Sequence, residues 1–279
     1  MRLALIQERQ NALYAFHSEE LLGPQDAILD LMEKMVQQNL SLLEQAAEAG
    51  ADLALTSEAI NYPGVPSLLG GLSSAELVAC GQDGLYQRFS RLARAAGMNI
   101  VVGVLWREAN GALYNTALVF DRRGCEAHRY HKNFLAGDEK DYMTAGCGFP
   151  IWEGEFGRVG VGICWDLQFP VVAQSYALQG ADLVLCPTWG WESTYATARA
   201  YENGIYLASA MAVPSYKPIV GPRMPSSVIS PTGQVLVEGG RDSEGVVILD
   251  IDDFHAFSHL REMRMGDLRE WMRRGGVRA

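Results

Sequence analysis

Three side chains that can take part in bond-breaking chemistry stand at the ends of predicted β-strands. They are Glu58 after residues 52–56, Lys132 after residues 125–130, and Cys164 at the end of residues 157–164. Functional residues of α/β folds collect where strands end and loops begin. Each of the three also has an ordinary explanation. Loop glutamates and lysines are mostly solvated charges, and a cysteine that ends an apolar strand is usually part of the core.

Together, these three side chains form a complete set for attack on a carbonyl or nitrile carbon. A thiol nucleophile needs a base to remove its proton, and the Glu58 carboxylate is such a base. An ammonium group such as that of Lys132 lowers the pKa of a nearby thiol and neutralises an oxyanion. Spacing along the chain does not by itself bring Cys164 to the other two. The surrounding elements therefore have to be predicted as well.

Strands and helices alternate in the first part of the chain, and hairpins interrupt the alternation later. The predicted helices cover residues 26–49, 74–96, 171–179, 193–203 and 254–272. The second of these helices opens with the capping box Ser73 to Glu76, and Asn110-Gly111 predicts a hairpin turn. The predicted strands are 2–7, 52–56, 100–106, 113–121, 125–130, 157–164, 182–186, 206–213, 227–230, 235–238 and 245–251. This mixture predicts two packed mixed sheets with helices outside. No repeat or linker divides the chain, so we expect one domain over residues 1–279.

The composition excludes several classes of protein. Hydrophobic residues make up 48% of the chain, too many for a disordered one. The net charge is −10, which argues against binding to a nucleic-acid backbone. Apolar runs such as residues 100–106 are far shorter than the roughly 20 residues needed to span a bilayer. The apolar run at the N-terminus is too short for a signal peptide, so we expect a cytoplasmic protein.

The five cysteines give no sign of a metal site or a disulfide framework. They stand at positions 80, 125, 147, 164 and 186. Their number is odd, and no two form a CxxC pair, which fits neither a structural zinc site nor paired disulfides. We therefore expect reduced thiols. Any special role for Cys164 has to come from its surroundings.

Three sequence blocks follow one another in a fixed order. They are Ser57-Glu58 with Tyr62 and Gly64, Tyr130-His131-Lys132 with Gly137 to Lys140, and Gly162 to Pro170 around Cys164. In this order the blocks resemble the nitrilase superfamily, the carbon–nitrogen hydrolases, and in particular its amidase-like branch. The resemblance runs from about Arg2 to Ile251. It implies a four-layer α-β-β-α sandwich of two mixed sheets, commonly assembled as a homodimer.

The resemblance also implies a role for each reactive residue. Glu58 corresponds to the general base, and Cys164 to the nucleophile that forms a thioester. Lys132 corresponds to the group that holds the oxyanion, with the backbone N–H of Trp165 as a second donor. Glu139 matches a second glutamate that orients the lysine and the substrate amide. The resemblance implies no metal and no organic cofactor.

The chain departs from the usual family pattern at several positions. Ser57 replaces a proline before the base, and Met211 stands where asparagine is frequent. Gln168 stands where many members carry an arginine that often pairs with a substrate carboxylate, so an acidic substrate is less expected. Residues 9–24 form an addition after the first strand, for which we expect a plain surface loop, with a lid or a dimer contact as the alternatives.

Aromatic residues near the blocks suggest the walls of a substrate site. By position, Trp189 is expected to face the pocket, with Tyr62 opposite. For Trp191 the sequence leaves two alternatives open, a place in the pocket wall or one in a dimer interface.

The leading prediction is an enzyme that hydrolyses a small, neutral or apolar amide to a carboxylic acid and ammonia. One alternative is hydrolysis of N-carbamoyl amines. Another is a nitrilase, although nitrilases typically have glutamate at the position of Asp166 and a longer C-terminal tail. An interaction protein without activity is the alternative from another class. The complete set of Glu58, Lys132 and Cys164 argues against it.

Overall fold

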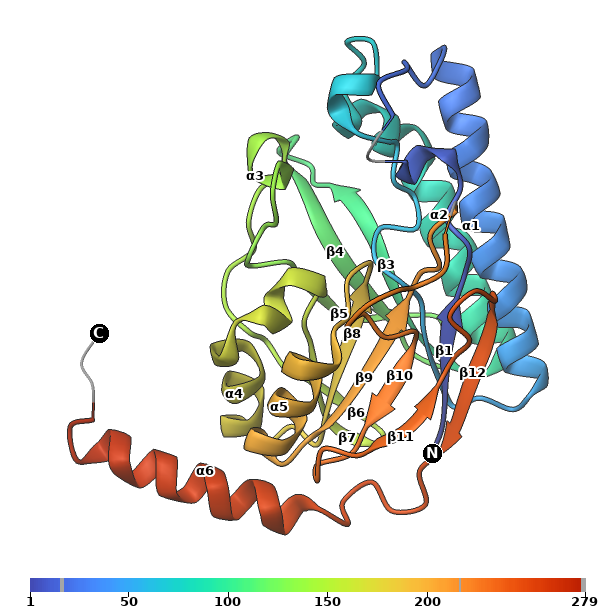
Figure 1. Cartoon of the computed structure of the whole chain (residues 1–279). Helices are drawn as coiled ribbons and strands as arrows, with labels where there is room; N and C mark the ends of the chain where they lie inside the picture. The colour runs from blue at the N-terminus through green and yellow to red at the C-terminus, as the bar shows by residue number, and fades with distance from the viewer. Residues whose placement is uncertain (16–17, 216, 277–279) are drawn as a thin grey trace.

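Two six-stranded sheets lie face to face in the computed structural model, which describes residues 1–15, 18–215 and 217–276 (Figure 1). The first sheet has the order β12 (Gly245–Asp250), β1 (Arg2–Gln7), β2 (Leu53–Leu55), β3 (Asn99–Arg107), β4 (Leu113–Phe120) and β5 (Glu126–His131). The second has the order β11 (Val235–Glu238), β10 (Ser227–Ile229), β9 (Tyr206–Met211), β8 (Leu183–Thr188), β7 (Gly157–Val161) and β6 (Trp152–Gly154). Both sheets mix parallel and antiparallel pairs.

Helices cover the outer face of each sheet. They are α1 (Gln25–Glu48) and α2 (Ser74–Ala96) on the first sheet, and α4 (Pro170–Leu178) and α5 (Ser193–Asn203) on the second. The inner faces share one apolar core, to which the first sheet contributes Leu5 and Val101 and the second contributes Val161 and Leu185. The predicted α-β-β-α sandwich is therefore confirmed.

The parallel strands bring chemically useful loops to one end of the sandwich. In the first sheet β1, β2 and β3 are parallel, and in the second β7, β8 and β9 are parallel. Past the ends of β1 and β9, Arg9 and Val213 form a parallel bridge that joins the two sheets. The residues after β2 and those after β8 therefore meet at the same end, which is where active sites of such folds are found.

Helix α2 has the serine half of the predicted capping box and a glycine at its C-terminal end. The side chain of Ser73 accepts a hydrogen bond from the backbone N–H of Glu76 at 3.4 Å. At the other end, Gly97 has a φ of 60°, the left-handed conformation that glycine adopts without a Cβ penalty. Helix α2 thus begins and ends at residues that specify its boundaries.

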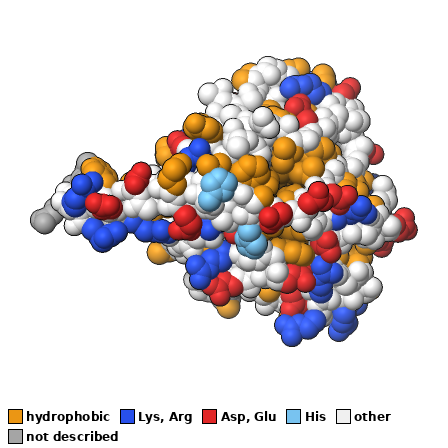
Figure 2. Space-filling model, turned by 90° about the horizontal axis from the view of Figure 1, so that it is seen from below, with side chains coloured by type: hydrophobic (Ala, Val, Ile, Leu, Met, Phe, Trp, Pro, Cys, Tyr) orange, Lys and Arg blue, Asp and Glu red, His pale blue; other side chains and the backbone are white. Residues whose placement is uncertain are grey.

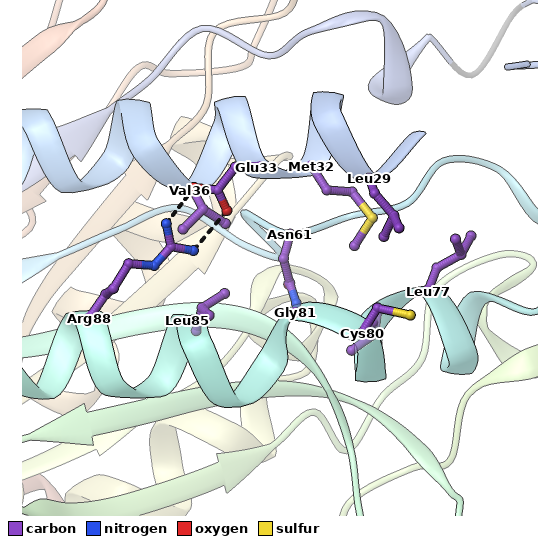
Figure 3. Close-up of a pocket in the computed structure, with 11 residues that line it drawn as sticks. Leu29, Met32, Glu33, Val36, Asn61, Leu77, Cys80, Gly81, Leu85 and Arg88 are labelled. Carbon is purple, nitrogen blue, oxygen red and sulfur yellow. Dashed lines mark hydrogen bonds and ion pairs between the residues drawn. The ribbon is translucent and has the colours of Figure 1, made fainter. Parts of the chain in front are cut away.

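A cleft of about 200 Å³ lies between α1 and α2 (Figure 3). Apolar side chains such as Met32, Val78 and Leu85 line it, and the ion pair of Arg88 with Glu33 lies at its rim. Gly81 of α2 borders the cleft, and no atom lies within 4 Å of the position that a Cβ would take there. Packing therefore does not require glycine at this position.

The structure differs from the predicted elements at several places, and β6 lies where no strand is predicted. The predicted strand 157–164 ends at Val161, because Cys164 begins a 3₁₀ turn (Cys164–Gln168). A short helix, α3 (Glu139–Tyr142), interrupts the predicted loop after β5. The described part of residues 9–24, which leaves out residues 16 and 17, is not a plain surface loop, since Leu13 and Tyr14 are 1% and 2% exposed and pack in the core.

The last helix, α6 (Ser258–Arg273), packs against α4 and α5, and Arg269 donates to the backbone oxygen of Leu178 at 2.7 Å. Its C-terminal end extends away from the two sheets (Figure 1). Seen from below, it forms an arm with acidic and basic side chains along it (Figure 2). Arg261 anchors the arm by donating a hydrogen bond to the backbone oxygen of Ala181 at 3.1 Å. Within the described residues, no helix is long and apolar enough to cross a membrane.

Candidate active site

A buried lysine lies between two carboxylates at the end of the first sheet. Lys132 Nζ donates to Glu58 Oε1 at 2.8 Å and to Glu139 Oε1 at 2.8 Å. Lys132 and Glu58 are each 1% exposed, and Glu139 is 9% exposed. Glu58 lies just beyond β2, Lys132 follows β5 directly, and Glu139 begins α3. The structure therefore brings Glu58 to Lys132, which is 74 residues away in sequence, and to Glu139, which follows Lys132 by seven residues.

Asn115 completes this cluster, and sequence reasoning missed it. Its Nδ2 donates to Glu58 Oε1 at 2.8 Å and to Glu139 Oε1 at 3.1 Å. The backbone oxygen of Asn115 also accepts the N–H of Lys132 at 2.8 Å. An asparagine within the mostly apolar strand β4 was a usable signal, because buried amides need partners.

The charges of the cluster fix its protonation. Burial alone lowers the pKa of Lys132, but the carboxylates of Glu58 and Glu139 outweigh it and raise the pKa above its ordinary value. Burial raises the pKa of Glu139, helped by the charge of Glu58 and opposed by Lys132. Lys132 is therefore a permanent cation in this site.

Cys164 comes from the second sheet and has an unusual backbone. Its φ of 46° lies in the left-handed region, which residues other than glycine rarely adopt. Such strained residues cluster at functional sites. Burial raises the pKa of the Cys164 thiol to about 12, with a further increase from Glu58 and an opposing effect of Lys132. The charges of Glu58 and Lys132 thus change the pKa of the thiol in opposite directions.

One buried aspartate joins the lysine loop to the cysteine turn. Asp166 Oδ2 accepts the N–H of Ile163 at 2.9 Å and the hydroxyl of Tyr130 at 2.7 Å. Asp166 Oδ1 accepts the backbone N–H groups of Asn133 and Phe134 at 3.1 and 2.8 Å. Burial raises the pKa of Asp166 to about 6 despite these donors. Its side chain thus holds together the two segments that carry Lys132 and Cys164.

Aromatic rings cover Glu58. Trp189 donates its backbone N–H to Glu58 Oε2 at 3.1 Å and its indole N–H to the backbone oxygen of Glu58 at 2.5 Å. Its ring meets those of Tyr62 and Tyr14 at centroid distances of 5.0 and 5.1 Å. Tyr62 thus packs directly on Trp189, and Tyr14 from the segment 9–24 joins them. Trp189 and Tyr14 line the cavity at Cys164, whereas Tyr62, expected opposite Trp189, is not among the lining residues.

A cavity of about 560 Å³ opens at Cys164. Tyr14, Trp165 and Trp189 line it together with Cys164, and Trp165 is 41% exposed. Lys217 and Arg223 line it as well, both on the segment between β9 and β10. The cavity has room for a small substrate in contact with the thiol.

Trp191 lies in neither of the two expected places. It is fully buried in the core beneath α4 and α5. Its indole N–H donates to Ser227 Oγ at 2.8 Å. No group of three or more His, Cys, Asp or Glu residues in the described part of the chain is arranged to hold a metal ion.

Comparison with known families agrees with this architecture. The sequence profile of the carbon–nitrogen hydrolases matches residues 18–255. The chain belongs to the carbon–nitrogen hydrolase family. It is 29% identical over 240 residues to omega-amidase NIT2 of Xenopus tropicalis, covering 80% of this chain and 83% of that protein.

Solved structures of the amidase from Nesterenkonia sp. AN1 are similar over almost the whole chain. One carries acrylamide added to its active-site cysteine. It has a TM-score of 0.70, is 28% identical, and the similarity covers 97% of this chain and 99% of that one. Another, a variant in complex with butyramide, has a TM-score of 0.71 at 27% identity, covering 99% and 97%. The chain is thus a carbon–nitrogen hydrolase of the amidase-like type.

Proposed function

We propose that the protein hydrolyses small amides to a carboxylic acid and ammonia through a thioester on Cys164. The observation that carries this proposal is the buried Lys132 ammonium, held at 2.8 Å by both Glu58 and Glu139 and acting on the Cys164 thiol. A cation in that position neutralises the oxyanion formed when the thiol attacks a carbonyl carbon. Glu58 is the base, and Glu139 orients Lys132.

The reaction has two steps. Glu58 takes the thiol proton while the sulfur bonds to the amide carbon. It then passes this proton to the amide nitrogen, the C–N bond breaks, and ammonia leaves. Glu58 next removes a proton from water, which attacks the thioester and releases the acid and the free thiol. The N–H of Trp165 is the second oxyanion donor beside Lys132. Splitting the hydrolysis in this way replaces one difficult step with two easier ones.

The raised pKa of Cys164 explains why the base has to be close. With a pKa of about 12, almost none of the thiol is ionised at neutral pH. A thiolate therefore forms only as substrate arrives and Glu58 takes the proton. The enzyme thus avoids holding a reactive thiolate in its resting state.

The cavity supports a neutral or apolar acyl group. Trp165, Trp189 and Tyr14 offer apolar surface beside the thiol, and aromatic walls favour apolar substituents. The butyramide bound by the similar amidase is a small neutral amide. Primary amides of short aliphatic or aromatic acids are therefore the expected substrates.

A specific observation favours a second candidate, an amide whose acyl group ends in a carboxylate. Lys217 and Arg223 line the cavity and offer the positive charge that the Gln168 position lacks. A relative is named as an omega-amidase. This candidate calls for the same chemistry at Cys164 and differs only in the acyl group.

The test is ammonia release from primary amides, ω-carboxy amides, N-carbamoyl amines and nitriles. The Cys164→Ala variant and the matched Cys125→Ala variant, which alters an exposed thiol, are run in parallel. We expect release from amides, lost in Cys164→Ala and kept in Cys125→Ala. Ammonia release from N-carbamoyl amines alone would indicate an N-carbamoyl amine hydrolase, and release from nitriles alone would indicate a nitrilase. No release from any compound would favour an interaction protein.

We also propose a cytoplasmic homodimer that uses the helices on the outside of the second sheet. Exposed apolar side chains there include Val171 of α4, Tyr201 of α5 and Met263 of α6. Surface of this kind marks protein contacts. Light scattering is expected to give the mass of a dimer, and that of a monomer for Val171→Glu.

A further inference from the structure

Four side-chain hydrogen bonds close a ring around the two glutamates of the site. Lys132 Nζ and Asn115 Nδ2 each donate to Glu58 Oε1 and to Glu139 Oε1, over 2.8 to 3.1 Å. Asn115 and Lys132 are each 1% exposed. An amide nitrogen carries two hydrogens, and both of those on Asn115 are used in this ring. Asn115 therefore binds the two carboxylates and has no donor left for a substrate.

The stability of the fold does not account for the Asn115 amide. Its Oδ1 is buried and makes no hydrogen bond to any residue that the structure describes. A buried carbonyl oxygen without a partner costs free energy of folding, and the strand β4 around it is mostly apolar. The amide is therefore present at a cost to the fold.

The ring leaves the two oxygens of Glu58 in different states. An oxygen of a carboxylate has two lone pairs, and those of Oε1 are taken by Lys132 and Asn115. Within the described residues, Oε2 accepts one hydrogen bond, from the backbone N–H of Trp189 at 3.1 Å. One lone pair of Oε2 is therefore open, whereas Oε1 has none with which to take a proton.

Oε2 of Glu58 also lies on the side of the nucleophile. Its donor, Trp189, directly follows β8 of the second sheet, and Gly190 comes next. A Cβ at Gly190 would lie 4.0 Å from Cys164 Sγ, so this turn runs along the sulfur. Oε2 of Glu139, in contrast, accepts a backbone N–H of the loop just before α3 at 2.6 Å. Glu58 therefore offers its open lone pair on the side of the thiol, and Glu139 does not.

We propose that Asn115 is a positioning residue, which closes Glu58 Oε1 and so leaves Oε2 as the atom that takes the proton of Cys164. This inference rests on the proposed role of Glu58 as the base, and it concerns which atom acts and how it is held. The S–H bond breaks as an O–H bond forms on Oε2, and the sulfur keeps the electron pair with which it attacks the amide carbon. Without the Asn115 amide, Oε1 regains a lone pair, and the carboxylate turns out of this geometry.

The first test separates kcat from KM. In Asn115→Ala we expect kcat for amide hydrolysis to fall about tenfold, with KM changed by less than about twofold, because Asn115 does not contact the substrate. Asn39→Ala is the matched control. Asn39 of α1 is also buried, and its Oδ1 also has no partner among the described residues, so kcat should stay unchanged. A kcat in Asn115→Ala equal to that of the unmodified enzyme would overturn the inference.

A second readout does not depend on amide hydrolysis. Acrylamide adds to the active-site cysteine of the similar amidase, and its addition to Cys164 is followed by peptide mass spectrometry. We expect Asn115→Ala to slow the addition about tenfold in the protein with Glu58, and by less than about twofold when it is combined with Glu58→Gln. A loss of the same size in both proteins contradicts the inference, since Asn115 would then act through Lys132 or Glu139.

The two readouts distinguish this inference from the proposed function. Coupling between Asn115 and Glu58 in a protein that hydrolyses no amide would support the positioning and reject the substrate class. Hydrolysis of amides without such coupling would keep the proposed function and reject the positioning. If Asn115→Ala does not fold, both measurements are made on Asn115→Leu, which has a similar volume and no hydrogen-bond donor.

Discussion

Trp189 holds Glu58 by both of its N–H groups. Its backbone N–H lies 3.1 Å from the Glu58 carboxylate, and its indole Nε1 lies 2.5 Å from the Glu58 backbone oxygen. Trp189 directly follows β8 of the second sheet, whereas Glu58 lies beyond β2 of the first. The proposed base is therefore oriented by the sheet that carries the nucleophile.

Replacing Trp189 with phenylalanine tests this contact. The ring packing against Tyr62 and Tyr14 is kept, but the indole hydrogen bond is lost. We expect kcat for amide hydrolysis to fall roughly tenfold with stability nearly unchanged. Trp191→Phe is the matched control, because it loses an indole bond to Ser227 in the core. It is expected to lose about 1 kcal/mol of unfolding free energy and little activity. The reverse pattern would contradict the assignment.

Asp166→Asn is expected to damage both stability and activity. Every group that contacts the Asp166 carboxylate is a hydrogen-bond donor. An asparagine turns an NH₂ group toward one of these donors, which costs about 1–3 kcal/mol. Urea unfolding and kcat measure the two effects. Asp267→Asn, on the exposed side of α6, should change neither. Full activity in Asp166→Asn would show that the lysine loop and the cysteine turn are held by other contacts.

Tyr14 is expected to limit the size of the acyl group. It lines the cavity and donates its hydroxyl to the backbone oxygen of Ala59 at 2.8 Å. Tyr14→Ala widens the cavity, and kcat/KM for hexanamide relative to propionamide should rise about tenfold. Tyr14→Phe keeps the ring and should keep the preference of the unmodified enzyme. An identical preference in all three proteins would place the acyl group elsewhere.

Two glycine-to-alanine changes are expected to have opposite effects. At Gly81 of α2 the added methyl group meets nothing within 4 Å, so the change should stabilise the protein by about 0.5–1 kcal/mol. At Gly103 of β3 it overlaps the backbone oxygen of Ser57 and comes within 3.0 Å of Glu58 Cα. The second change should therefore destabilise the fold and displace the base. Thermal unfolding and kcat distinguish the two outcomes.

The stability of the fold is expected to depend on pH through Glu8. Its pKa is raised from 4.5 to about 7 in the folded protein. The protonated group therefore stabilises the fold fully below pH 4.5, and this contribution is lost as the pH rises through 7. We compare the free energy of unfolding of Glu8→Gln with that of the unmodified protein at each pH. The value for Glu8→Gln minus that for the unmodified protein should rise by about 3 kcal/mol between pH 4.5 and 8. A difference that is independent of pH would show that Glu8 ionises normally.

Local signals in the sequence were sufficient to predict much of the fold. Helix α2 lies between its caps Ser73 and Gly97 as predicted, and α5 covers residues 193–203 as the pattern indicated. The resemblance to the family, which rests on short motifs, indicates four site residues: Glu58, Lys132, Glu139 and Cys164. These features are readable because each depends on neighbouring residues or on a short motif.

The features that were missed depend on contacts between distant residues. The left-handed turn at Cys164 is anchored by Asp166, whose other partners lie 32 or more residues away. Tyr14 becomes part of a cavity wall only because Trp189, from the other sheet, packs on it. The spacing of apolar residues along the chain does not predict contacts between such distant residues. Sequence spacing therefore predicted a surface loop for residues 9–24.

The division of the site between two sheets has a consequence for the newly made chain. The carboxylates and the lysine belong to the half that is synthesised first, and the thiol to the half that follows. The first sheet itself is complete only when β12, near the end of the chain, pairs with β1. The side chains at the site therefore reach their places together only after nearly all of the chain has been made.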